Sequence, residues 1–216
     1  MIFLKKQSKQ NIYPLFKSLF DLIFFFIVII IGSPLFLLIA ILIKFSSRGP
    51  IFFYHKRIGK NFKSFYCIKF RTMHPEADDI LENLLDKNED IKNEFEKTHK
   101  LRNDPRITSI GKFLRKTSLD ELPQFLNVLK MEMSVIGPRP IVEKELEKYG
   151  NQINKVISIN PGITGLWQVS GRNNLSYKKR IYLDSLYVES FNFLMDLRII
   201  IRTFGVLLFP MDRGAY

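Results

Sequence analysis

The chain has 216 residues, and its 33 lysines and arginines against 21 aspartates and glutamates give a formal net charge of +12. One domain has roughly 100–200 residues, so a chain of this length is expected to form a single domain, with room for an appended element. A hydrophobic content of 46% is enough for a buried core, so a wholly disordered chain is excluded. The single cysteine, Cys67, excludes an intramolecular disulfide framework, and the three histidines lack the spacing of zinc ligands.

The charge is distributed unevenly along the chain. The stretch from Glu76 to Glu96 contains nine acidic and two basic residues, so the rest of the chain has 12 acidic and 31 basic residues, a net charge of +19. A body this basic favours an anionic partner. Nucleic acid, an anionic membrane surface and phosphorylated substrates all fit, and charge does not choose among them.

The segment from Leu22 to Ile43 is uncharged and apolar, reading LIFFFIVIIIGSPLFLLIAILI. About 20 apolar residues span the hydrocarbon core as a helix, which predicts that this segment enters a membrane. It is too long for a secretory signal peptide, and no small-residue cleavage site follows it. Lysine or arginine flanks it on both sides, which is typical of a segment with both ends in the cytoplasm.

The middle of this segment contains Gly32, Ser33 and Pro34, which predict a kink. Pro34 cannot donate the hydrogen bond to the carbonyl four residues earlier, and the Ser33 hydroxyl can supply a partner for a freed carbonyl. Two arrangements fit the residues equally well. One is a pair of half-helices broken at Ser33-Pro34 with both ends cytoplasmic, and the other is an ordinary spanning helix with a proline kink.

The remaining elements follow from hydrophobic patterning. The run 50–54 fits a strand or a membrane-skimming turn, and Phe65–Phe70 fits a strand. The acidic stretch 76–97 has apolar residues near helical spacing, which predicts an amphipathic helix or a helical hairpin. Further along, the sequence predicts helices over 122–133 and 141–149, a loop-rich stretch around 163–169, helix again from 176, and an apolar core or interface helix over 193–209.

Asp120 and Glu121 are adjacent carboxylates in the segment SLDELPQ. A structural explanation is a helix cap, with Asp120 as the N-cap or with Ser118 and Glu121 as a capping box. A chemical explanation is open as well, because the sequence around the pair is basic and includes Arg115. An aspartate can attack a phosphoryl group, and a carboxylate pair suits Mg²⁺.

Three further segments combine turns or strands with basic side chains. Arg139 lies between two prolines in GPRP, a stiff turn that suits phosphate recognition. Arg172 ends the glycine-rich segment PGITGLWQVSGR, whose glycines permit close approach to a ligand but match neither a Walker loop nor a dinucleotide fingerprint. Lys69 and Arg71 flank an apolar residue at the end of a predicted strand, which a solvated strand face also explains.

Taken in order, these motifs resemble the bacterial sugar transferase family, the small monotopic phosphoglycosyl transferases that begin glycan assembly on undecaprenyl phosphate. The resemblance extends from Lys17 to Tyr216 and rests on GPIFFYHKRIGKNFKSFYCIKFRTM, DPRITSIGKFLRKTSLDELPQFLNVLKMEMSVIGPRP, PGITGLWQVSGRN and RGAY. The pattern from SLDELPQ to GPRP is highly specific. The segments GLWQVSGRN and RGAY are most similar to undecaprenyl-phosphate galactose or glucose phosphotransferases.

The resemblance implies a two-step reaction. Asp120 attacks the β-phosphorus of a UDP-sugar, UMP leaves, and undecaprenyl phosphate then takes the phosphosugar from the aspartyl intermediate. Glu121 positions or deprotonates the acceptor phosphate and shares a Mg²⁺ site with Asp120, with Mn²⁺ as the alternative ion. Substrate-binding roles fall on five basic residues: Lys69, Arg71, Arg115, Arg139 and Arg172.

The resemblance also implies a fold, which is an α/β, mostly helical chain with a re-entrant membrane helix broken at Ser33-Pro34, amphipathic interface helices and a small sheet. Residues 1–48 form the N-terminal segment and membrane helix in this expectation. Residues 49–216 form one catalytic domain, with 76–97 as an acidic helical insertion.

The expected location is the cytoplasmic face of the bacterial inner membrane. The expected partners are undecaprenyl phosphate, a UDP-sugar and membrane lipids. Nucleic acid is not expected as a partner, and the sequence leaves open whether the protein forms a homodimer. The competing hypothesis is a membrane-anchored basic module that binds anionic lipid or nucleic acid without catalysis.

Overall fold

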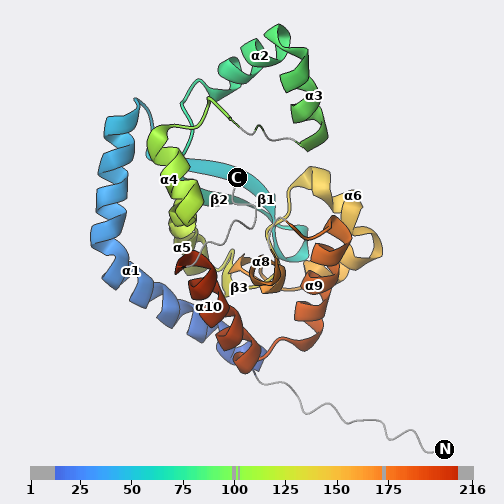
Figure 1. Ribbon diagram of the computed structural model, residues 1–216. Coiled ribbons are helices and arrows are strands. Elements are labelled where there is room, and N and C mark those ends of the chain that lie inside the picture. Colours follow the sequence, from blue (N-terminus) through green and yellow to red (C-terminus); the bar gives the residue numbers. More distant parts are fainter. Residues whose placement is uncertain (1–12, 99–100, 102, 172–173, 209–216) are drawn as a thin grey trace, which may run out of the picture.

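The computed structural model describes residues 13–98, 101, 103–171 and 174–208. These residues are mostly helical, with a β-hairpin and a short parallel strand pair between the helices (Figure 1). The α/β, mostly helical class predicted from the sequence is confirmed.

The membrane-type segment forms one helix, α1, Tyr13–Ser46, with Pro34 inside it. The Ser33 hydroxyl donates to the Ile30 carbonyl oxygen at 3.1 Å, and this is the carbonyl that Pro34 leaves without its usual donor. Because the freed carbonyl is satisfied locally, the helix continues through the proline. α1 is helical on both sides of Pro34 and bends around the body (Figure 1), and the break expected at Ser33-Pro34 stays a prediction.

A β-hairpin follows the membrane-type helix. β1, Phe52–Ile58, pairs antiparallel with β2, Ser64–Phe70, across the 3-10 turn η1, Lys60–Phe62. Asn61 and Phe62 have positive φ angles of 52° and 63°, which reverse the chain tightly. The strand predicted at Phe65–Phe70 is confirmed, and the run at 50–54 is a strand that begins two residues later and extends to Ile58.

The acidic stretch forms a helical hairpin, which is one of the two predicted alternatives, the other being a single amphipathic helix. α2, Ala77–Lys87, and α3, Glu89–Thr98, stand away from the body (Figure 1). Their apolar side chains are half-buried, and the two helices contact each other. α4, Ser109–Thr117, then returns to the body, and its N-cap residue Thr108 accepts a hydrogen bond from the Gly111 N–H at 2.9 Å.

The middle of the chain is more broken than expected. It contains the 3-10 turn η2, Leu119–Gln124, the helix α5, Phe125–Leu129, and the strands β3, Ser134–Ile136, and β4, Gly162–Thr164. The single helix predicted over 122–133 is wrong, because its first turn is 3-10 around Pro123 and Met131, with a φ of 58°, reverses the chain after α5. β3 and β4 pair in parallel, and β4 lies at the edge of the stretch predicted to be loop-rich.

Short helices and two longer ones complete the fold. They are η3, Glu143–Glu145, α6, Leu146–Tyr149, η4, Gly150–Gln152, α7, Ile153–Val156, α8, Leu166–Ser170, α9, Tyr177–Ser190, and α10, Phe193–Leu208. The helix expected over 141–149 forms only from Glu143. The two C-terminal helices agree with the prediction as far as the described residues extend.

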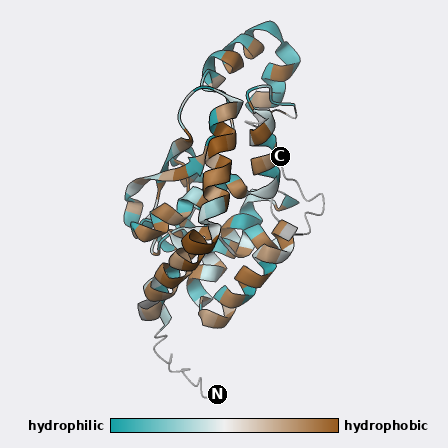
Figure 2. Ribbon diagram, turned by 90° about the vertical axis from the view of Figure 1, so that its left-hand side faces the viewer, coloured by the Kyte–Doolittle hydropathy of each residue, from teal (hydrophilic) through white to brown (hydrophobic). Residues whose placement is uncertain are grey.

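Both halves of α1 pack on the same body. Phe25 joins a core cluster that contains Ile136, whereas Ile39 packs in a second cluster with Phe70. Between them the helix is open to its surroundings, and Ile31 is 76% exposed. Figure 2 shows hydrophobic residues along the helix that follows the N-terminal trace. The division of the chain into an N-terminal segment, residues 1–48, and a catalytic domain, residues 49–216, stays a prediction.

Candidate active site

The segment that carries Asp120 and Glu121 begins with a sharp change of direction. Ser118 ends α4 in the left-handed conformation, with a φ of 57°, and its N–H donates to the Arg115 carbonyl at 3.2 Å. η2 follows at once, with both carboxylates in its first turn. Ser118 is its N-cap residue and makes no side-chain capping hydrogen bond, so the helix-cap explanation does not account for this pair.

Glu121 is paired with a lysine from the β-hairpin. Lys69 Nζ lies 2.6 Å from Glu121 Oε1, in a place where the two side chains are only 19% and 27% exposed. Burial acts to raise the pKa of Glu121, but the positive charges of Lys69, Arg139 and Arg57 outweigh it and hold the pKa below its usual value. Glu121 is therefore ionised at neutral pH.

Asp120 has the opposite shift. Burial raises the pKa of Asp120 from 3.8 to about 6; Lys69 and Arg115 oppose the rise, and the negative charge of Glu121 adds to it. Neighbouring carboxylates whose pKa values are pushed apart are suited to different chemical roles. Asp120 is mostly ionised at pH 7 and is more basic than an ordinary aspartate, as an attacking carboxylate requires.

A stiff turn holds Arg139 beside these carboxylates. The Gly162 N–H on β4 donates to the Pro138 carbonyl at 2.7 Å. A Cβ atom on Gly162 would lie 2.0 Å from the Gly137 nitrogen, so the two backbone segments approach this closely only because glycine is present. The Arg139 guanidinium lies over the Trp167 ring, 5.9 Å from its centroid.

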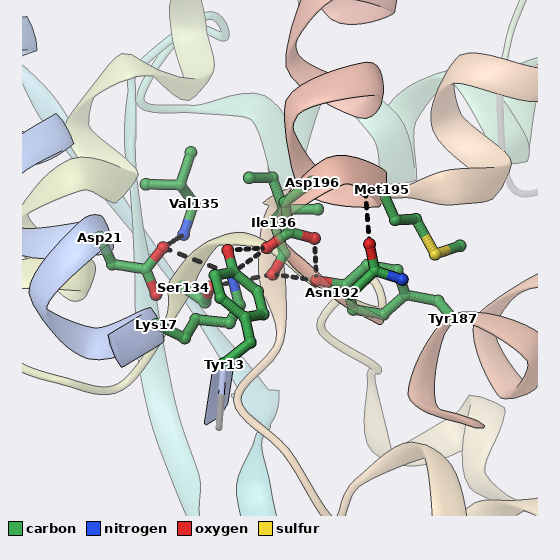
Figure 3. Close-up of polar contacts among 10 residues, drawn as sticks. All are labelled: Tyr13, Lys17, Asp21, Ser134, Val135, Ile136, Tyr187, Asn192, Met195 and Asp196. Atoms are coloured by element: carbon green, nitrogen blue, oxygen red, sulfur yellow. Dashed lines mark hydrogen bonds and ion pairs between the residues drawn. The ribbon is translucent and has the colours of Figure 1, made fainter. Parts of the chain in front are cut away.

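The strand that leads into this turn is fastened to α1 and α10 (Figure 3). The anchoring cluster consists of Tyr13, Lys17, Asp21, Tyr187 and Asp196. The Val135 N–H on β3 donates to Asp21 Oδ1 at 3.1 Å. Lys17 Nζ lies 2.8 Å from Asp196 Oδ2, and the two tyrosine hydroxyls each donate to the Asp196 carboxylate at 2.7 Å. The position of the Arg139 turn therefore depends on where the first half of α1 packs.

Arg57 and His55 on β1 also belong to the site, although the sequence motifs did not single them out. Arg57 Nη1 donates to the Pro140 carbonyl at 3.2 Å, and Nη2 lies 3.2 Å from His55 Nδ1. Burial, and after it the charge of Arg57, lowers the pKa of His55 to about 4, so the ring stays neutral. The register of the hairpin is the feature that identifies them. Phe53 lies opposite Lys69, and because side chains alternate along a strand, His55 and Arg57 lie on the same face as Lys69.

Asp184 on α9 is the second buried group that sequence reasoning missed. The Tyr149 hydroxyl donates to its Oδ2 at 3.3 Å, while its Oδ1 has no hydrogen-bond partner among the described residues. Burial raises the pKa of Asp184 to about 8, and the bond from Tyr149 and the nearby Arg139 lower it in part. Its one signal in the sequence is an acid one turn before Tyr187, on the buried face of α9.

One recess of about 1670 Å³ brings the described candidate residues together. It is lined by Lys69, Arg71, Arg115, Asp120, Glu121 and Arg139. Arg172, the remaining candidate, lies outside the described residues.

Two of these arginines are also engaged by the protein itself. Arg71 donates to the Arg48 carbonyl at 2.7 Å and to the Ser47 carbonyl at 2.9 Å, so it fastens the chain just after α1. Arg115 Nε donates to Thr72 Oγ1 at 2.9 Å. Substrate binding by Arg71 stays a prediction, and the contact that the structure gives it is an anchoring one.

The carboxylates of the recess fit a metal ion only in part. In the portion of the chain that the structure describes, no group of three or more His, Cys, Asp or Glu side chains could hold a metal. Asp120 and Glu121 nevertheless offer oxygen ligands, and Mg²⁺ commonly takes one or two carboxylates and completes its shell with waters and substrate phosphates. The donor set therefore suits an ion that arrives with a diphosphate.

Comparison with known proteins places the chain in a family. The sequence model of the family described as "Bacterial sugar transferase" matches residues 12–210. Exopolysaccharide production protein ExoY of Rhizobium meliloti (strain 1021) is 47% identical over 200 residues, which is 93% of this chain and 88% of that protein.

Two longer proteins are also similar. Undecaprenyl-phosphate galactose phosphotransferase of Salmonella typhimurium is 45% identical over 93% of this chain and 41% of its own length. UDP-glucose:undecaprenyl-phosphate glucose-1-phosphate transferase of Klebsiella pneumoniae is 38% identical over 90% of this chain and 40% of its own length.

Proposed function

The chain belongs to the bacterial sugar transferase family, and from this membership we propose that it transfers a sugar-1-phosphate from a UDP-sugar to undecaprenyl phosphate. The names of the similar transferases support the carrier lipid, with galactose or glucose as the sugar. Support from the site is a recess in which two adjacent carboxylates face several lysines and arginines. Such positive charge suits diphosphate chemistry, where negative charge grows on the leaving phosphate.

The observation that carries the proposal is that Asp120 and Glu121 line one recess together with Lys69 and Arg139, with Lys69 Nζ 2.6 Å from Glu121 Oε1. In the first step, an Asp120 carboxylate oxygen forms a bond to the β-phosphorus of the UDP-sugar. The bond from that phosphorus to the bridging oxygen breaks, and UMP leaves with the electron pair. Arg139 and Lys69 stabilise the charge that develops on the phosphate oxygens.

In the second step, an oxygen of undecaprenyl phosphate attacks the same phosphorus. The bond to Asp120 breaks, so that the carboxylate is restored and undecaprenyl-diphosphate-sugar is formed. Glu121 holds the acceptor phosphate in line and accepts its proton where one is present. A bound Mg²⁺ would neutralise phosphate charge, and Asp120 and Glu121 are the residues that would hold it.

The proposed location is the cytoplasmic face of the bacterial inner membrane. α1 is long and apolar enough to enter a bilayer. Both of its halves pack on the same body, which supports a re-entrant path in preference to a spanning one. A lipid phosphate and a soluble nucleotide sugar can then meet at one interface.

The decisive experiment is UMP release from a panel of UDP-sugars with undecaprenyl phosphate in nanodiscs. The wild type is expected to release UMP, and the preferred member of the panel identifies the sugar. Asp120→Asn is expected to lower the rate by about 10³-fold or more, since the nucleophile is removed. It should also lose the burst of UMP, equal to the enzyme present, that forms without acceptor.

Asp86→Asn on the exposed α2 surface is the matched control and should behave as wild type. Normal turnover by Asp120→Asn would contradict the covalent step.

Metal removal gives an independent check. Excess chelator should abolish turnover, and Mg²⁺ should restore it, with Mn²⁺ tested as the alternative ion. Full activity after exhaustive chelation would exclude a metal role for Asp120 and Glu121.

A further inference from the structure

The recess has two unlike ends. One wall comes from α1 and α10 and is apolar apart from one threonine, with Phe24, Val28, Ile200, Phe204, Val206 and Leu207. The other end is lined from β1, α6 and α9 by polar and charged side chains such as His55, Lys148 and Arg180. Figure 1 shows α1 and α10 on one side of the molecule and α6 and α9 on the other.

The apolar wall connects the carboxylates to the outer surface. Leu122 follows Glu121 directly in the chain, and both line the recess together with Phe125. The Phe125 ring stacks on Phe24 of α1, with 6.1 Å between the centroids. Apolar side chains therefore continue from the residue next to Glu121 to the membrane-type helix.

The outer faces of the same two helices are apolar and exposed. Ile27 on α1 is 50% exposed and Ile201 on α10 is 63% exposed. Phe204 is 54% exposed and also lines the recess. The wall is thus continuous with a surface that would lie against lipid, because exposed apolar area of this extent is unfavourable in water.

We propose that the wall between α1 and α10 binds the first isoprene units of the acceptor lipid, with the phosphate at Glu121 and the rest of the chain in the bilayer. This inference rests on the proposed function and assigns one of its two substrates to a place. A polyprenyl phosphate has a charged head joined to an apolar chain. It therefore needs an apolar path that ends at the reactive carboxylates. The polar end is left for the nucleotide of the donor.

The test separates a lipid groove from general membrane contact. Phe204→Ala removes a side chain that lines the recess, and Ile201→Ala removes one of similar exposure on the same helix that does not line it. Both variants are assayed in nanodiscs with undecaprenyl phosphate as a varied mole fraction. Phe204→Ala is expected to raise KM for the acceptor about tenfold, from the loss of an aromatic contact. Ile201→Ala is expected to stay within about twofold of wild type.

Two further readouts make the result specific. Phe204→Ala should leave KM for the UDP-sugar and the acceptor-free UMP burst unchanged. Phe204→Ala should raise KM for a short-chain polyprenyl phosphate by a similar factor, because that acceptor has the same first isoprene units. Leu207→Ala, which changes the same wall, is the second variant should Phe204→Ala not fold.

Equal effects of Phe204→Ala and Ile201→Ala would overturn the groove and leave only membrane contact. A rise in KM for the donor instead of the acceptor would overturn it too. Either result leaves the proposed transferase reaction intact, because wild type still turns over. Absence of UMP release by wild type with every UDP-sugar would instead overturn the reaction, and the groove with it.

Discussion

Asp120 and Glu121 show how one peptide bond can separate two different carboxylates. Both are shielded from water, yet Glu121 has a lysine at 2.6 Å and Asp120 does not. The nearest cation decides which of the two stays a strong acid. Burial makes Asp120 the more basic carboxylate, whereas Lys69, with Arg139 and Arg57, keeps Glu121 ionised.

The pH dependence of the donor half-reaction should report this arrangement. Asp120 must be ionised to attack, and its pKa of about 6 lies above the usual 3.8, so activity should be full well above pH 6, half of that near pH 6, and lost as pH falls further. Lys69 is the strongest of the charges that lower this pKa. Lys69→Gln should therefore move the acidic limb of kcat/KM for the UDP-sugar to higher pH, by roughly one unit.

Lys69→Arg keeps the charge and is the matched control for this shift. A limb that stays in place in Lys69→Gln would show that the lysine does not govern Asp120.

At the scale of elements, α4 depends on one glycine. A Cβ atom on Gly111 would lie 1.9 Å from the Thr72 carbonyl oxygen, with backbone and no flexible side chain in its way. That carbonyl also accepts the Thr108 N–H at 3.0 Å, so the helix start cannot move away freely. Gly111→Ala should lower the free energy of unfolding by about 2 kcal/mol or more, and it should reduce activity because α4 carries Arg115.

Gly205→Ala on α10 supplies the comparison. Apart from the helix backbone itself, no atom of the described residues lies within 4 Å of its added Cβ, so this variant should be neutral or stabilising by up to about 1 kcal/mol. Thermal melting of both variants in the same detergent measures the difference. Equal melting temperatures would show that the contact at Gly111 can relax.

The elements that were predictable are those with a pattern long enough to read. The strand at Phe65–Phe70, the acidic hairpin and the two C-terminal helices have such patterns. β3 and β4 have three residues each and lie where turns or a helix also fit the sequence. Such short segments contain too few residues to show a strand periodicity. The helix over 122–133 failed because Met131 adopts a left-handed conformation that no local pattern announces.

The residues of the candidate site also fall into those that the sequence predicted and those that it did not. Asp120, Glu121, Lys69 and Arg139 lie in turns and strand ends whose chemistry was visible in short motifs, and all of them line one recess. Arg57 depends on the register of a hairpin, and Asp184 depends on how α9 packs beneath a turn far away in sequence. Such positions are fixed by tertiary contacts, which a single sequence does not display.

At the scale of the whole molecule, α1 is held at both ends. Lys17 bonds Asp196 near its start, and Ile43 packs with Phe70 near its finish. A helix with both ends on one body should have both ends on one side of the membrane. Ser18→Cys and Ser46→Cys, both exposed, test this, since the one native cysteine, Cys67, is only 1% exposed and gives little background.

Both engineered cysteines should react with a membrane-impermeant maleimide in inside-out vesicles, and both should be protected in right-side-out vesicles. Labelling of the two positions from opposite sides would show a spanning helix.

The anchoring cluster also bears on how the chain is made. Lys17 and its partner Asp196 are separated by 179 residues, so a ribosome releases the lysine long before the aspartate exists. Until α10 emerges, Lys17 has Asp21 of its own helix as a partner but lacks Asp196, and the first half of α1 lacks part of the surface on which it packs. We therefore expect the first half of α1, although synthesised early, to take its final place only after the C-terminal helix has been made.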